Sequence, residues 1–108
     1  MSRAKGFEAE GRAADWLVAR GFKICDRNWL RKGGELDIVA EKEGVIHFIE
    51  VKSGEGFDPI YAFTPAKMAK VIRTAQQWLQ HKRIDAPWCV DALVMQDGAC
   101  ELIENITL

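Results

Sequence analysis

The spacing of apolar residues along the chain predicts two helices and five strands. Apolar residues recur with a helical period from residue 4 to Arg20, and Gly21 marks the end of that helix. Thr64 and Pro65 are a helix N-cap and first-turn pair, and they begin a second helical pattern that continues to residue 83. Strands are expected at residues 22–29, 35–41, 45–52 and 89–95, and residues 99–106 are expected to form a fifth strand or an edge extension. This order of elements predicts a single α/β domain over residues 1–108, with a mixed central sheet flanked by helices.

The expected apolar face of the first helix contains an acidic residue. Successive residues of a helix are about 100° apart. The apolar face defined in this way is formed by Phe7, Ala14, Leu17 and Val18. Glu10 falls within this face, whereas Glu8 and Asp15 point away from it. The geometry therefore singles out Glu10 among the carboxylates of this helix.

Charged residues also interrupt two of the strand-like runs. Asp37 lies inside ELDIVAE, and Glu50 and Lys52 lie near the end of VIHFIEVK. Burying such groups is costly unless they are paired, hydrogen-bonded or bound to a metal. A hairpin that joins the two strands can place Asp37 about 5 Å from Glu50, and a helix packed on that sheet face can bring Glu10 to the same point. Three carboxylates predict a site for Mg²⁺ or Mn²⁺, whose charge they balance together with Lys52.

Such a site can hydrolyse a phosphodiester. The cation would lower the pKa of a bound water and neutralise the charge that develops on the phosphate, while Lys52 would orient that water or stabilise the developing charge. The simpler alternative for Glu50 and Lys52 is an ion pair at a strand end. Glu35 shares the face of Asp37 and is a further candidate ligand, although its position at the start of the strand favours a solvated side chain. Asp91 is a polar residue in an apolar strand to which the pattern assigns no role.

Positive charge is concentrated in two segments on either side of an acidic centre. Residues 20–32 hold five basic residues and one acidic residue, a net +4, and residues 59–84 hold five basic residues and no acidic residue, a net +5. Residues 33–58 and residues 85–108 each sum to −5. This distribution suits a nucleic acid, most simply DNA, that approaches a metal site, although solvated faces would give the same blocks. The candidate nucleic-acid-binding residues are Arg27, Arg31, Lys32, Lys67, Lys70 and Arg73.

Composition sets the broad class of the protein. An apolar fraction of 48% and a charged fraction of 29% are typical of a soluble globular protein, and no run is long enough to span a membrane. A cytoplasmic location without membrane contact is the expectation. Cys25, Cys89 and Cys100 contain no CxxC pair and are expected to be buried, reduced thiols, because a zinc site would need more Cys or His at short spacing. His47 and His81 are isolated in the sequence.

The acidic motifs occur in an order that is itself informative. ExxAxxxL (Glu10 to Leu17) is followed by RGFKICDRN, GGELDIVA, FIEVKS, TPAKMAKVIRTAQQWL and VDALV. This series resembles the PD-(D/E)XK nuclease superfamily and, more closely, the bacterial YraN-like family. The resemblance extends from about residue 6 to residue 95, which is nearly the whole chain.

The resemblance implies a restriction-endonuclease-like core of αβββαβ topology, similar to that of archaeal-type Holliday junction resolvases. It also implies metal ligands at Asp37 and Glu50, a supporting acid at Glu10, a catalytic lysine at Lys52 and a Mg²⁺-dependent endonuclease that acts on structured DNA in repair or recombination. The chain departs from the pattern at two places. Leu36 replaces the proline that gives the superfamily its name, and Ser53 follows Lys52 where the family commonly continues with Thr-Arg.

A second class of function is compatible with the same motifs. It is a nucleic-acid-binding or adaptor domain that kept the fold and the site but lost efficient catalysis. The intact set of Asp37, Glu50 and Lys52 favours the nuclease. A chain of 108 residues offers little surface beyond such a site, which favours a homodimer or a partner protein.

Overall fold

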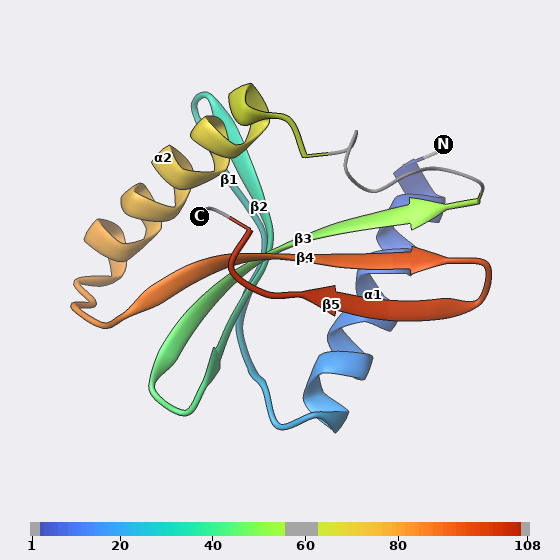
Figure 1. Cartoon of the computed structure of the whole chain (residues 1–108). Helices are drawn as coiled ribbons and strands as arrows, with labels where there is room; N and C mark the ends of the chain where they lie inside the picture. The colour runs from blue at the N-terminus through green and yellow to red at the C-terminus, as the bar shows by residue number, and fades with distance from the viewer. Residues whose placement is uncertain (1–2, 56–62, 107–108) are drawn as a thin grey trace.

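The computed structural model describes residues 3–55 and 63–106, which form a five-stranded mixed sheet between two helices (Figure 1). The elements are α1 (Arg3–Ala19), β1 (Lys23–Arg31), β2 (Gly34–Lys42), β3 (Val45–Gly54), α2 (Pro65–Lys82), β4 (Trp88–Gln96) and β5 (Ala99–Ile103). The strands lie side by side in chain order, and β3 and β4 are parallel while the other neighbours are antiparallel. The predicted fold class is confirmed, and this arrangement is compatible with a restriction-endonuclease-like core.

The helices begin and end where the sequence signals predict. After α1, Gly21 adopts a φ of 90°, a left-handed conformation that glycine tolerates without steric cost. At the start of α2, the Thr64 side chain accepts a hydrogen bond from the backbone N–H of Lys67, and Pro65 occupies the first helical position. In the described parts of the chain, neither helix is long and apolar enough to cross a bilayer.

Two apolar clusters cover the two faces of the sheet. Adjacent residues of β3, Phe48 and Ile49, point to opposite faces and belong to different clusters. Phe48 packs against α2, whose Trp78 ring meets its ring edge-on at a centroid distance of 5.6 Å. Ile49 belongs to the cluster of α1, which includes Leu17. Since β3 pairs with both β2 and β4, it lies in the centre of the sheet.

Three details differ from the expectations. Val18 does not lie on the buried face of α1 but is 56% exposed, and Ala9 and Ala13 are buried instead. Cys25 is exposed rather than buried, because it lies on the outer strand β1, where exposed and partly buried residues alternate. β5 ends at Ile103 rather than continuing to residue 106, so it is a short edge strand.

Candidate functional site

Asp37 and Glu50 meet where the pairing between β2 and β3 stops. The ladder extends as far as the pair Ile38 and Ile49, and beyond it side chains replace the backbone partners. The backbone N–H of Val51 donates to Oδ2 of Asp37 at 2.9 Å, and the backbone N–H of Asp37 points to Oε2 of Glu50 at 3.4 Å. The structure thus brings together the two carboxylates that the hairpin geometry predicts as neighbours.

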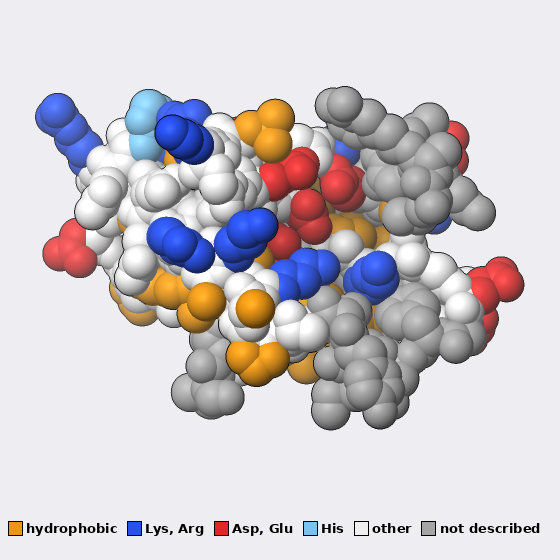
Figure 2. Space-filling view, turned by 90° about the horizontal axis from the view of Figure 1, so that it is seen from above, with side chains coloured by type: hydrophobic (Ala, Val, Ile, Leu, Met, Phe, Trp, Pro, Cys, Tyr) orange, Lys and Arg blue, Asp and Glu red, His pale blue; other side chains and the backbone are white. Residues whose placement is uncertain are grey.

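These two carboxylates line a hollow of about 270 Å³ between the sheet and α2. The hollow is lined by Gly34, Glu35, Asp37 and Glu50 from the sheet and by Lys67, Lys70, Val71 and Thr74 from α2. Figure 2 shows acidic side chains gathered in this region, with Lys and Arg side chains beside them. The hollow therefore combines acidic groups from the sheet with basic groups from α2.

Burial makes the ionised form of both carboxylates unfavourable. Glu50 is buried, and this burial, together with the nearby charge of Asp37, raises its pKa to about 8. Burial is also the main reason that the pKa of Asp37 lies above its usual value, and Glu35 adds to the effect. The positive charge of Lys67 opposes the rise in the pKa of both groups. A divalent cation in the hollow would oppose it far more strongly.

Glu10 approaches Asp37 from the other side of the sheet. It lies on α1, which packs on the face of Ile38 and Ile49 rather than on the face covered by α2, and Glu10 is not among the described residues that line the hollow. Glu10 nevertheless interacts electrostatically with Asp37. Its pKa is raised first by burial and then by the charges of Asp37 and Glu35. A hydrogen bond with Asn28 lowers that pKa. Among the described residues, Oε2 of Glu10 is buried without a hydrogen-bond partner.

The lysines that line the hollow come from α2 rather than from β3. Lys52 follows Glu50 by two residues on β3 and is partly buried, but it does not line the hollow. Lys67 and Lys70 do, because they lie one helical turn apart on the same side of α2. Lys67 was a candidate for phosphate contact in the sequence. The structure adds that the charge of Lys67 acts on both Asp37 and Glu50.

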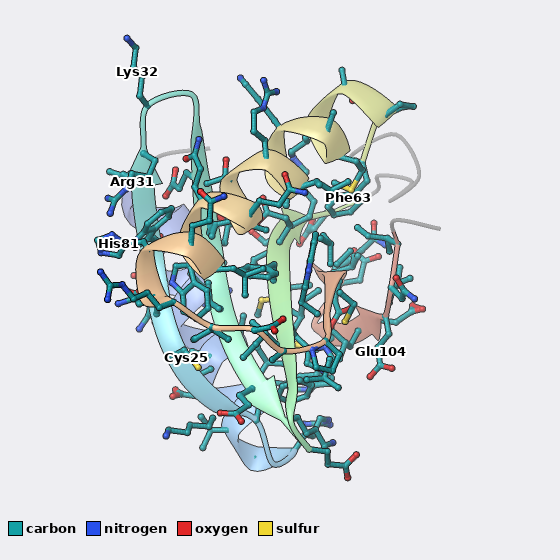
Figure 3. All side chains as sticks on the ribbon, turned by 90° about the vertical axis from the view of Figure 1, so that its left-hand side faces the viewer. Cys25, Arg31, Lys32, Phe63, His81 and Glu104 are labelled. Carbon is teal, nitrogen blue, oxygen red and sulfur yellow. The ribbon has the colours of Figure 1, made fainter. Side chains whose placement is uncertain are left out.

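The other candidate nucleic-acid-binding residues are exposed. Arg27 and Arg31 lie on β1, Lys32 lies in the turn after it, and Arg73 lies on α2. In Figure 3 Lys32 projects from the turn between β1 and β2. The guanidinium of Arg31 lies 4.0 Å above the ring of Trp29, so one face of that ring is already covered.

A second group of polar side chains was missed in the sequence. His47, Cys89 and Asp91 hold ligand-type atoms within 4.8 Å of one another, and no other trio of such residues in the described ranges does so. His47 is therefore not isolated, and Asp91 gains a structural role. Burial and then the charge of Asp91 raise the pKa of Cys89 to about 12, so its thiol is protonated at neutral pH and is not a ready nucleophile. The sequence offered one signal for this group, which is that His47 and Asp91 each interrupt an apolar strand.

The chain resembles proteins from several bacteria over its full length. Residues 9–93 match the model of the family described as "Uncharacterised protein family UPF0102". A UPF0102 protein of Wolinella succinogenes is 54% identical over 108 residues, which cover all of both chains. A UPF0102 protein of Helicobacter pylori is 52% identical over 105 residues, covering 97% of this chain and 92% of the relative. One from Helicobacter hepaticus is 50% identical over 107 residues, covering 99% and 97%.

Proposed function

The chain belongs to the UPF0102 family, and we propose that it is a metal-dependent nuclease that hydrolyses phosphodiester bonds in structured DNA. The observation that carries this proposal is the pair of carboxylates, the buried Glu50 and the partly buried Asp37, in a hollow that is also lined by Lys67 and Lys70. Acidic groups alone would repel a phosphate. A site that bound phosphate through basic groups alone would gain nothing from two nearby carboxylates. A bound divalent cation would explain why both kinds of group are present, because it binds the carboxylates and attracts the phosphate.

The residues of the hollow fit Mg²⁺ or Mn²⁺. Both ions prefer carboxylate oxygens and keep several water ligands, so two carboxylates in a water-accessible hollow are sufficient. Asp37 and Glu50 each use one oxygen in a contact with the backbone, which fixes the direction of the side chain. Among the described residues, the buried Oε2 of Glu10 lacks a hydrogen-bond partner and Glu10 lies near Asp37, which suits a supporting acid that acts through a bound water.

The cation would supply an activated water and neutralise charge on the phosphate. The chain itself would hold Asp37 and Glu50 in place through the end of the β2–β3 ladder. Lys67 and Lys70 would position the phosphate, since both line the hollow. We assign to Lys52 the role of stabilising the transition state, because strand alternation directs it to the same sheet face as Glu50.

DNA would approach over the side of the molecule that carries both α2 and the β1–β2 turn. Lys67, Lys70 and Arg73 extend along α2. Arg31 ends β1, and Lys32 lies in the turn that follows it. Contacts of this kind to the phosphate backbone are independent of base sequence and weaken as salt increases. The proposed nuclease therefore recognises the shape and charge of its substrate rather than a base sequence.

The test is a cleavage assay on four-way junctions, single-stranded DNA, duplex DNA and RNA, each with Mg²⁺, Mn²⁺ or a chelator. We expect cleavage of at least one branched DNA with metal and none with chelator. Asp37→Asn keeps an acceptor for the N–H of Val51 but removes the charge, so it should remain folded and inactive. Asp15→Asn removes an exposed acidic charge from α1 and serves as the matched control, which should cleave like the wild type.

The same assay separates the nuclease from the alternative function. Binding of branched DNA without cleavage under any metal condition would replace the enzyme with a nucleic-acid-binding domain. If the chain neither bound nor cleaved any of these nucleic acids, both functions would be wrong.

A further inference from the structure

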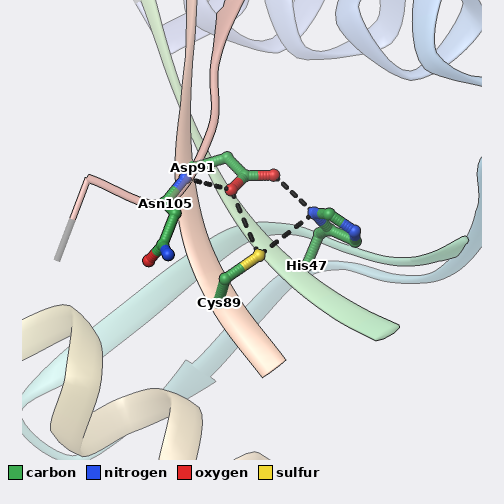
Figure 4. Close-up of polar contacts among 4 residues, drawn as sticks. All are labelled: His47, Cys89, Asp91 and Asn105. Atoms are coloured by element: carbon green, nitrogen blue, oxygen red, sulfur yellow. Dashed lines mark hydrogen bonds and ion pairs between the residues drawn. The ribbon is translucent and has the colours of Figure 1, made fainter. Parts of the chain in front are cut away.

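Three side chains of metal-binding type converge on the face of the sheet opposite the hollow. The parallel pairing of β3 and β4 places His47 beside Cys89, and Asp91 follows Cys89 by two residues on the same face. Nδ1 of His47 lies 2.6 Å from Oδ2 of Asp91 and 3.2 Å from Sγ of Cys89, and Sγ lies 3.3 Å from Oδ1 of Asp91 (Figure 4). A nitrogen, a sulfur and a carboxylate therefore meet at one point.

The surrounding structure holds these side chains in place. Asp91 is fully buried, and its Oδ1 also accepts the backbone N–H of Asn105 at 2.9 Å. The ring of Phe22 packs edge-on against the ring of His47 at a centroid distance of 5.1 Å. Cys89 is only partly buried, so the group has a route to solvent. Donors fixed in this way lose little entropy on binding an ion.

We propose that His47, Cys89 and Asp91 bind a divalent transition-metal ion of the zinc type. Thiolate and imidazole are ligands that Zn²⁺ prefers, whereas Mg²⁺ and Ca²⁺ take oxygen ligands. One thiolate, one carboxylate and a neutral imidazole balance the charge of the ion. The N–H of Asn105 orients the carboxylate through its second oxygen, as is common behind metal ligands.

The distances fit this ion after a small adjustment. With zinc bonds of about 2.0–2.3 Å at tetrahedral angles, donor atoms lie roughly 3.3–3.6 Å apart. The separation between Sγ of Cys89 and Nδ1 of His47, 3.2 Å, is already close to this range. The separation between His47 and Asp91 is shorter because the two groups share a hydrogen bond, which the ion would replace. On binding, the thiol releases its proton to solvent, and His47 carries its remaining proton on Nε2.

This site is distinct from the proposed nuclease centre. Along β3, His47 and Glu50 are three residues apart, and strand alternation points them to opposite faces. An ion here would join the starts of β3 and β4 to the segment after β5 through Asn105. Its role would be to stabilise the fold, and it would not require nuclease activity.

Co²⁺ titration of the full chain under reducing conditions tests the proposal, because Co²⁺ takes the place of Zn²⁺ and reports its ligands by absorption. We expect visible bands of a tetrahedral site and a near-ultraviolet thiolate band, both saturating at one Co²⁺ per chain, and loss of both when Zn²⁺ is added. Cys89→Ser should abolish the thiolate band. It should weaken binding by more than the roughly 10- to 100-fold typical of losing an outer hydrogen-bond partner.

Two controls make the result specific. Cys25→Ser changes an exposed cysteine of β1 and should leave the spectrum unchanged. Asp37→Asn changes the hollow and should also leave it unchanged. The proposal is overturned if the wild type gives no thiolate band, if the band survives Cys89→Ser, or if Cys25→Ser removes it. The wild-type spectrum decides the question even if Cys89→Ser does not fold.

Discussion

Replacing Glu50 with Gln should stabilise the metal-free protein at neutral pH. The pKa of Glu50 is raised from 4.5 to about 8 by burial and by Asp37. Because the folded chain keeps a proton that the unfolded chain releases, stability is greatest below about pH 4.5 and is lost as the pH rises to about 8. Between these values the free energy of unfolding should fall by about 1.4 kcal/mol per pH unit from this group alone.

The assay is urea unfolding of the wild type and Glu50→Gln in chelator at about pH 5 and about pH 7. The two proteins should be similar at the lower pH, and the variant should be more stable by about 3 kcal/mol at the higher pH. Gln keeps an acceptor for the N–H of Asp37, so the contact at the end of the ladder remains. Glu35→Gln, at an exposed position of the same hollow, should show a much smaller difference.

Metal should largely cancel this difference in stability. Mn²⁺ at 100 times its dissociation constant should add about 2.7 kcal/mol to the wild type and little to Glu50→Gln. Equal pH dependence of the two metal-free proteins would refute the reasoning, since it would mean that Glu50 is not held protonated in the folded chain.

Three further predictions follow from the contacts around the hollow. Lys67→Glu should weaken DNA binding in filter-binding assays and lower the salt slope by about 1, whereas Arg20→Glu, which changes a residue stacked on Trp16, should not. Gly34→Ala should destabilise the chain by about 1–3 kcal/mol in thermal unfolding, because the new Cβ would lie 2.1 Å from Oγ1 of Thr74. Adding Thr74→Ala should recover most of that loss, and no recovery would show that the contact is not the cause. Lys52→Ala should lower the single-turnover cleavage rate by roughly 100- to 1000-fold without changing DNA affinity, and an unchanged rate would exclude it from the transition state.

The local signals for helices and turns were sufficient to predict the order of elements. Thr64 and Pro65 cap α2 as expected, and Gly21 follows α1 in the conformation that its position requires. The periodicity of α1 was less reliable, since Val18 is exposed. A short helix that packs on a twisted sheet buries its small residues closest to the strands, and a helical wheel drawn from side-chain hydrophobicity gives those small residues too little weight.

The candidate sites differ in how far the sequence could reveal them. Asp37 and Glu50 belong to one hairpin, so strand pairing alone predicted that they meet. Glu10 depended on which sheet face its helix covers, and the pattern of α1 does not contain that information. His47 and Cys89 are 42 residues apart and meet only because β4 returns parallel to β3, a pairing that no local spacing encodes.

The Mn²⁺ dependence of single-turnover cleavage is the most direct test of the central claim. Wild type and Asp37→Asn, purified in the same way, are compared on one labelled four-way junction across a range of Mn²⁺ concentrations. The proposed nuclease predicts a wild-type rate that rises with Mn²⁺ and saturates, and a rate in Asp37→Asn that stays at the level of the chelator control. Equal rates in the two proteins, or no cleavage by the wild type at any Mn²⁺ concentration, would contradict it.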